Sequence, residues 1–133
     1  MRAMHTLLAT SLAAICLVSG SVGAAQNSAP KKVEIVSVTG CLREQGAGNW
    51  MVVAATDPVP SNANAPLKRD LPTTPVTGSN QFKLIGVGEF NLATFRNQTV
   101  VVKGLYIKAT PVDRLNITSV TTAVSSCAET APN

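Results

Sequence analysis

The sequence predicts an all-β domain, a small five-stranded Greek-key barrel with one short helix between the third and fourth strands. Three observations support this prediction: five runs are rich in β-branched residues, polar turns separate them, and glycines interrupt the alternation within several runs. Small barrels need bulges and glycines to turn their corners, so these interruptions have a physical cause. A chain of 133 residues holds one such domain at most.

The first residues have the pattern of a secretory signal peptide. Arg2 precedes an apolar run at residues 7–18, and the small residues Val22 and Ala24 occupy the −3 and −1 positions of a cleavage site. We therefore expect cleavage after Ala24, no membrane span afterwards, and a periplasmic or secreted bacterial protein. Residues 25–32 are polar and small, and we expect a disordered leader there.

Cleavage would also change the chemistry available to the domain. Of the 133 residues 109 would remain, and the only histidine, His5, would be lost with the signal. Lys+Arg would fall from 11 to 10 against 7 acidic residues, a net charge of +3. This composition excludes Ser-His-Asp and Cys-His catalysis and histidine-based zinc or copper sites. The basic residues are single or paired, so nucleic-acid binding is not expected.

The predicted strands occupy residues 33–44, 50–56, 81–87, 99–109 and 115–126. The apolar alternation slips midway along the first strand, and Gly40 is the point where its backbone can bend or approach a neighbour closely. Gly104 is a second bend point in the fourth strand, and the fifth strand slips in the same way as the first. Residues 88–98 carry apolar side chains at near-helical spacing and predict the short helix. The polar tail, residues 128–133, is expected to be flexible.

Residues 57–80 form a long connection between the second and third strands. The segment contains five prolines and almost no hydrophobic periodicity. A 24-residue connection is long for a compact domain, and such connections are either mobile or functional. Lys68 and Arg69 at its centre make it a candidate docking loop, and a mobile solvated loop is the alternative.

Cys41 and Cys127 stand near opposite ends of the domain. Export would place both in an oxidising compartment, and their number is even after cleavage, so we predict a structural disulfide between them. The bond would close a loop of about 86 residues and contribute about 4–5 kcal/mol in the chain-entropy model. Buried free thiols are the alternative, because no CxxC spacing supports a redox pair.

Several short motifs carry a resemblance to a known family. They are VTGCL (38–42), FKLIG (82–86), VVVKG (100–104), ITSV (117–120) and the closing dipeptide Ser126-Cys127. In this order the chain resembles the small exported bacterial OB-fold-like proteins, mostly uncharacterised, with Gly-Cys-Leu near the start of the domain. The resemblance spans about residues 33–127 and implies an OB-like barrel and an exported location, without catalytic residues. The proline-rich insertion departs from the family pattern.

The second and third strands provide the sheet face that many OB-folds use for ligands. Trp50 and Phe82 fall on these strands, and Lys83 and Tyr106 are companions of this candidate ligand face. Aromatic rings there could stack on a sugar or a base. The alternative is that Trp50 and Phe82 fill the barrel core, because the domain has only five aromatic residues.

Taken with the composition, these patterns favour a non-catalytic binding or interaction module of the bacterial cell envelope. We expect a monomer without cofactor or metal, whose partner is an unknown envelope protein, peptide or saccharide. Among the seven scattered carboxylates only Glu44 and Asp113 lie at strand ends that a barrel could bring together. A histidine-independent hydrolase is therefore the less favoured alternative. A passive structural or accessory envelope protein is the other.

Overall fold

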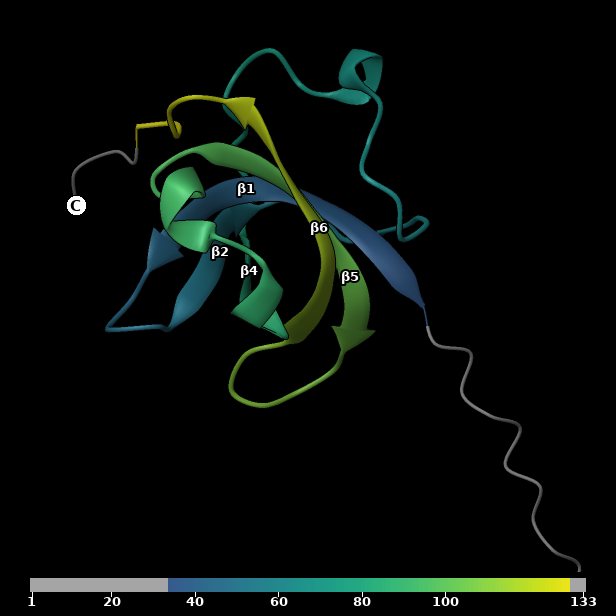
Figure 1. Cartoon of the computed structure of the whole chain (residues 1–133), viewed down its shortest axis with the longest axis vertical. Coiled ribbons are helices and arrows are strands. Elements are labelled where there is room, and N and C mark those ends of the chain that lie inside the picture. Colours follow the sequence, from purple (N-terminus) through teal and green to yellow (C-terminus); the bar gives the residue numbers. More distant parts are fainter. Residues whose placement is uncertain (1–33, 130–133) are drawn as a thin grey trace, which may run out of the picture. The chain divides into compact units, whose positions relative to one another are not determined.

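A computed structural model describes residues 34–129 of the chain. The predicted signal peptide (1–24) and leader (25–32) lie outside the described residues, as do residues 130–133 of the predicted tail. The described part contains six strands and three short 3-10 helices (Figure 1). In chain order they are β1 (Ile35–Glu44), β2 (Trp50–Ala55), β3 (Val59–Pro60), η1 (Lys68–Asp70), β4 (Asn80–Ile85), η2 (Val87–Glu89), η3 (Leu92–Phe95), β5 (Thr99–Ile107) and β6 (Arg114–Val124).

All six strands belong to one sheet, ordered β2–β4–β6–β5–β1–β3, and β2 also pairs with β1. The five longer strands therefore pair in a circuit β1–β2–β4–β6–β5–β1, and β1 also pairs with the short β3 (Figure 1). These pairs are antiparallel except β4 with β6, which run parallel. The all-β prediction is confirmed, and the five predicted strands are present, each ending within two residues of its expected end.

The helix predicted within residues 88–98 is wrong in type. The structure has two 3-10 turns there, η2 and η3, of three and four residues, and Phe90 between them is extended. The apolar residues at near-helical spacing reach the core from this irregular segment. Leu92 is buried in the core cluster, and Phe90 and Phe95 pack against that cluster. Their spacing therefore reflects contact with the sheet rather than a continuous helix.

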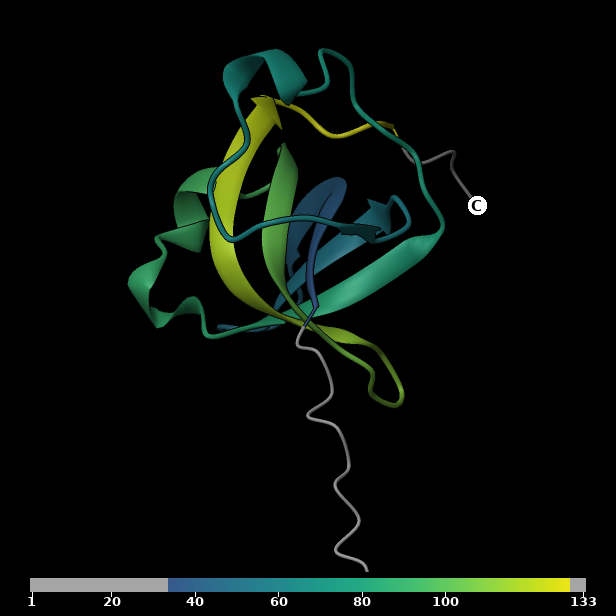
Figure 2. The ribbon, with the colours of Figure 1, turned by 90° about the vertical axis from the view of Figure 1, so that its right-hand side faces the viewer.

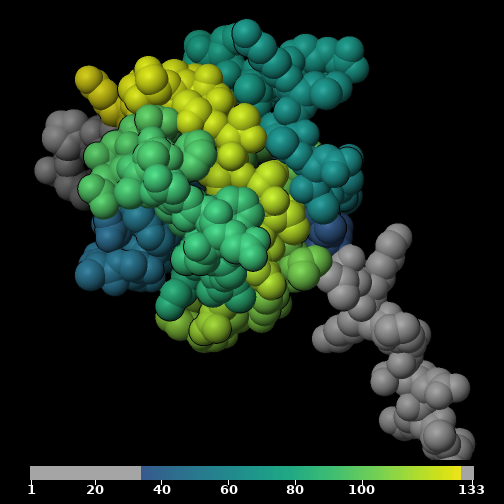
Figure 3. Space-filling model, viewed as in Figure 1, coloured from purple at the N-terminus to yellow at the C-terminus, as the bar shows by residue number. Residues whose placement is uncertain are grey.

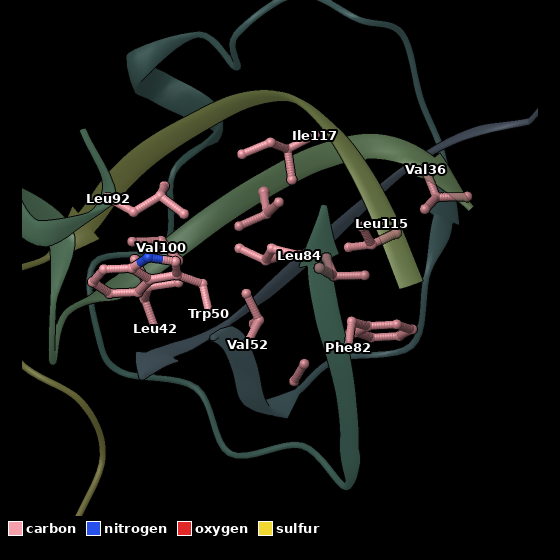
Figure 4. Close-up of a cluster of buried hydrophobic side chains, with 13 residues drawn as sticks. Val36, Leu42, Trp50, Val52, Phe82, Leu84, Leu92, Val100, Leu115 and Ile117 are labelled. Atoms are coloured by element: carbon pink, nitrogen blue, oxygen red, sulfur yellow. The ribbon is translucent and has the colours of Figure 1, made fainter. Parts of the chain in front are cut away.

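The core fills the interior of the circuit of strands (Figure 4). Side chains of a strand alternate between its two sides, so the strands contribute every second residue, except in β2, where the register shift brings Ala55 into the core after Val52. Trp50 lies at one end of the cluster and Phe82 at the other, with Leu84 and Leu115 between them (Figure 4). The most completely buried members are Val38, Leu42, Val52, Ala55, Val100, Val102 and Leu115.

Two glycines allow neighbouring strands to approach closely. A Cβ at Gly40 would lie 2.7 Å from Val52 Cγ1, and one at Gly104 would lie 2.5 Å from the carbonyl oxygen of Asn116. The β5–β6 register shifts beside Gly104, which confirms the predicted bend and the slip in the last strand. A further shift between β2 and β4, where Ala54 has φ of 48°, was not predicted.

The predicted disulfide is present. Cys41 of β1 is bonded to Cys127, which follows β6, and their Cα atoms are 5.4 Å apart. The bond therefore fastens the end of the last strand to the first strand. Within residues 34–129, no helix combines the length and the apolar character needed to cross a membrane.

Residues 57–80, which we call the cover segment, are fixed to the sheet at both ends. Near the first end β3 pairs with β1, and the amide of Ser61 donates to the carbonyl of Ile35 at 2.8 Å. Near the other end the amide of Gly78 donates to the carbonyl of Ala54 at 2.8 Å. The segment crosses the outer side of the sheet (Figure 2) and forms a raised mass beside β6 (Figure 3). It is the largest feature of the fold that sequence periodicity did not predict.

Candidate functional site

The aromatic residues proposed for a ligand face lie in the core. Trp50 is 8% exposed and Phe82 is 3% exposed, and both belong to the buried cluster. The guanidinium of Arg96 lies 5.5 Å from the centre of the Trp50 ring and covers it further. Neither ring offers an open face for stacking. The expected aromatic ligand face is therefore wrong for these two residues, which pack in the core as the alternative held.

Tyr106 also faces inward. Its ring meets Phe82 edge-on at a centroid distance of 6.3 Å, and its hydroxyl donates to Asp113 Oδ2 at 2.6 Å. Of the four residues singled out on this face, only Lys83 points away from the core, because it alternates with the buried Phe82 and Leu84. The structure therefore does not bring the four residues together.

Lys83 lies in a different row, on the outer side of the same strands. In the ladder Met51 of β2 is opposite Lys83 of β4, which is opposite Arg114 of β6. Arg43 of β1 is opposite Met51 and extends the row to a fourth strand. Opposite residues in neighbouring strands share a face, so three cations lie along one outer face. We call Arg43, Met51, Lys83 and Arg114 the cationic row.

A pocket of about 400 Å³ opens on the cationic row. Two loops border it, the β1–β2 turn and the connection between β5 and β6. In the β1–β2 turn, Asn49 Nδ2 donates to the carbonyl of Gln45 at 2.9 Å, while the buried Asn49 Oδ1 has no partner among the described residues. The lining residues are Gln45, Asn49, Met51, Gln81, Lys83, Pro111, Val112 and Arg114.

The cations of this pocket have no acidic partner. Among residues 34–129, the ion pairs are Arg69 with Asp70, Arg96 with Glu44, and Lys108 with Asp113. Lys83 and Arg114 take part in none of them. Arg43 is held by a neutral group, because its Nη1 donates to Asn97 Oδ1 at 2.7 Å. The row therefore presents positive charge that a bound anion could neutralise.

Both carboxylates considered for catalysis are committed to local structure. The amide of Gly48 donates to Glu44 Oε1 at 3.1 Å, and this bond, more than the neighbouring Arg96, lowers the pKa of Glu44. Asp113 accepts from the Tyr106 hydroxyl and from the amide of Ala109, which hold the pKa of its carboxyl below the usual range. Lowered values suit charged structural groups and not a general acid that must hold a proton near neutral pH.

Lys68 and Arg69 lie in η1 of the cover segment and are exposed. The Arg69 side chain is 81% exposed and lies 4.0 Å from Asp70, its sequence neighbour. Neither residue lines the pocket on the cationic row. The structure thus places these two cations apart from the face described above.

Comparison with family models, with curated proteins and with solved structures finds no match to this chain. Within the described residues, no group of three or more His, Cys, Asp and Glu side chains is arranged to hold a metal ion.

The sequence identified one member of this site and missed the others. The prediction put Lys83 on one face with Trp50 and Phe82. Alternation around Phe82 instead places Lys83 on the opposite side of the strand, and the same reasoning applied to Trp50 would have placed Met51 beside it. Arg114 could not be found in this way. It joins the row only because β6 runs parallel to β4, a pairing between strands that are distant in sequence.

Proposed function

We propose that this protein is an exported, non-catalytic binding module of the bacterial cell envelope, and that its cationic row binds an acidic saccharide. The single observation that carries the proposal is the pocket on the outer face of β2, β4 and β6, where Lys83 and Arg114 lie without an acidic partner among the described residues. Carboxylate or sulfate groups of a saccharide would pair with these cations.

The neutral lining of the pocket supports a saccharide over other anions. The amide side chains of Gln45, Asn49 and Gln81 can donate to and accept from hydroxyl groups. Single-stranded nucleic acids are usually held by aromatic side chains that stack on the bases. Trp50 and Phe82 are buried in the core, so this face offers the bases no aromatic platform.

The barrel itself is the second part of the proposal. We propose an OB-like architecture, because the five longer strands pair in a closed circuit and short helical turns connect β4 to β5. In OB-folds the ligand lies on the face of the second and third strands, bordered by the loop between strands one and two and the loop between strands four and five. The pocket on the cationic row occupies the corresponding place, between the β1–β2 turn and the β5–β6 connection.

Export is supported by the signal-like first residues and by the disulfide between Cys41 and Cys127. Disulfides persist in oxidising compartments such as the periplasm and are rare in the cytosol. A mass spectrum of the protein from the exported fraction tests this point. It should show cleavage after Ala24 and a mass two hydrogens below that of the dithiol form.

Binding to an acidic polysaccharide tests the functional proposal. We expect the oxidised protein to bind polygalacturonate but not the neutral polymer dextran, with an affinity that falls as salt is added. The Lys83→Gln/Arg114→Gln double variant should bind about 10-fold more weakly, because two ion pairs at a partly enclosed site are lost. Retention on immobilised polygalacturonate is a suitable readout.

A matched variant separates the site from net charge. Lys68→Gln/Arg69→Gln removes the same two charges from the cover segment, outside the pocket, and should bind as the wild type does. Equal losses in both double variants would show that only net charge matters and would contradict the proposal. Tighter binding of single-stranded DNA than of polygalacturonate would contradict the ligand class. Binding of neither polymer would favour a structural role.

A further inference from the structure

The outer side of β1, β5 and β6 carries polar residues beneath the cover segment. In the ladder Ser37 of β1 is opposite Lys103 of β5, which is opposite Ser119 of β6. These positions share a face, and it is the side away from the core, because Val36, Val38 and Val102 point inward. Lys103 is nevertheless only 7% exposed and Ser119 only 8% exposed. Two polar side chains are therefore nine-tenths buried outside the core.

Lys103 has little to compensate for its burial. Its Nζ donates to Asn62 Oδ1 at 3.4 Å, a long bond to an oxygen that also accepts from the amide of Asn64. An ammonium group has three donors to satisfy. No carboxylate of residues 34–129 forms an ion pair with it, and the neighbouring Ser119 Oγ has no hydrogen-bond partner there either. A buried cation without a counter-charge is energetically unfavourable.

Lys103 lines a pocket of about 560 Å³ between the sheet and the cover segment, which we call the covered pocket. The volume is within the range of small-molecule sites. On the sheet side Ser37, Thr39 and Val101 form its wall, and on the other side the cover segment contributes apolar and amide groups. The cover-segment residues are Val59, Ser61, Asn62, Asn64, Ala65, Pro66, Leu67 and Asp70.

We propose that the covered pocket binds a small organic monocarboxylate, whose carboxylate pairs with Lys103 and whose apolar part lies against Val101 and Leu67. This site goes beyond the proposed function, because it shares no residue with the cationic row. The ligand supplies the counter-charge that Lys103 lacks within the described residues. The Lys103 side chain provides a charge-assisted hydrogen bond, and the amide of Asn62 and the hydroxyl of Ser37 are further polar groups of the same pocket.

The charges of the covered pocket select a single negative charge. Lys103 is the only cation among the lining residues, and Asp70 is the only anion. A dianion such as phosphate would meet one positive and one negative group, so its second charge would be unpaired and repelled. The valine and leucine side chains in the lining favour an aliphatic chain over further hydroxyl groups.

A titration followed by amide chemical shifts tests this proposal on the oxidised protein. We expect sodium butyrate to produce saturable shifts at residues 59–70 and 101–103, with a dissociation constant of about 1 mM. Butyramide has nearly the same shape without the charge and should produce none. The Lys103→Met variant should bind butyrate about 10-fold more weakly or not at all, while the control variant Lys83→Met keeps wild-type affinity.

Asp70→Asn is a second variant, which tests the charge selection while leaving the buried Lys103 in place. Asp70 is exposed, so the fold should be unaffected, and removing its like charge should tighten butyrate binding about 2-fold. Unchanged affinity in Asp70→Asn would overturn the proposed charge selection. Saturable shifts from sulfate equal to those from butyrate would overturn the carboxylate assignment, and no saturation up to about 50 mM butyrate would overturn the site itself.

Failure of this inference can be told apart from failure of the proposed function. Lys103→Met should still bind polygalacturonate, and Lys83→Gln/Arg114→Gln should still bind butyrate. Loss of one activity with the other retained removes one proposal only.

Discussion

Two lysines on the outer side of the same sheet have different surroundings. Lys83 on β4 and Lys103 on β5 both alternate with core residues, yet Lys83 is half-buried and Lys103 is only 7% exposed. The sheet is the same in both places, and the difference is the cover segment, which lies over β1 and β5 but does not line the pocket at Lys83. An insertion between two strands has turned one outer face into a second buried region.

The difference also separates two kinds of recognition. The cationic row lies on a face bordered by short loops, where an extended ligand can lie across several strands. The covered pocket lies between the sheet and the cover segment, where a small ligand can contact both and reach the buried Lys103. Electrostatic attraction is screened by salt at exposed sites and much less at buried ones. Salt should therefore weaken polysaccharide binding more than butyrate binding.

The largest expected effect is that of removing the disulfide. This change tests whether the face with the cationic row and the face with the covered pocket unfold as one unit. The Cys41→Ser/Cys127→Ser variant removes a bond that spans 86 residues and should lower the free energy of unfolding by about 4–5 kcal/mol. We expect a single urea transition at lower urea, seen equally by Trp50 fluorescence and far-UV circular dichroism. Wild-type protein in reductant is the control and should unfold at the same urea concentration. Two separate transitions would mean that the faces are independent.

Removal of the cover segment should affect one face only. Replacement of residues 61–77 by a short Gly-Ser linker exposes Val101 and Lys103 and should cost about 2 kcal/mol through lost apolar burial. Hydrogen exchange should accelerate at residues 101–103 and butyrate binding should disappear, while polygalacturonate binding persists. Gly78→Ala keeps the cover segment but should displace its second end, because a Cβ there would collide with the carbonyl of Ala55. If polygalacturonate binding is lost as well, the two faces are coupled.

Replacement of each lysine by methionine compares the two faces directly. Lys103→Met removes a buried cation and keeps the apolar stem, so the free energy of unfolding should rise by about 1–2 kcal/mol. Lys83→Met replaces a half-buried cation and should change it by less than about 0.5 kcal/mol. Urea denaturation without added carboxylate measures both. Equal changes would show that the cover segment does not desolvate Lys103.

Local sequence patterns were enough to predict the strands but not their surroundings. The β-branched runs gave the five longer strands, and Gly104 marked a bend that the β5–β6 register shift confirms. The disulfide was predicted from the two cysteines, Cys41 and Cys127, that would remain after cleavage of the signal-like start. The strands and the bend depend on residues that are near in sequence. The disulfide depends on two cysteines that have no other partner after the predicted cleavage.

The functional sites depend on contacts that no local pattern encodes. Alternation alone would have placed Trp50 and Phe82 on one side and Met51 and Lys83 on the other, but it does not say which side is the core. Arg114 joins the cationic row through the parallel β4–β6 pairing. Lys103 is buried by a proline-rich segment without periodicity, whose path over β5 is set by its hydrogen bonds to the sheet.

The smallest expected effect concerns acid sensitivity at the edge of the cationic row. The pKa of Asp113 is lowered chiefly because the Tyr106 hydroxyl donates to it, and a lowered folded-state pKa contributes stability that is present above the unfolded-state pKa. That contribution is lost as pH falls through the folded-state pKa. Asp113→Asn should therefore lower Tm by roughly 3 °C at pH 7, and its difference from wild type should shrink below about pH 4.

The same contacts also contribute stability that is lost when the pH is raised, the reverse of the dependence expected for Asp113. The pKa values of Tyr106 and Lys108 are raised, in both cases first by the hydrogen bond with Asp113, so their contribution is present below the unfolded-state pKa and is lost as pH rises through the folded-state value. Thermal unfolding from pH 3 to pH 11 measures both limbs. Asp70→Asn, which removes an exposed carboxylate of the cover segment, is the control and should follow the wild-type profile. A constant difference between Asp113→Asn and wild type across this range would show that Asp113 stabilises the loop without its charge.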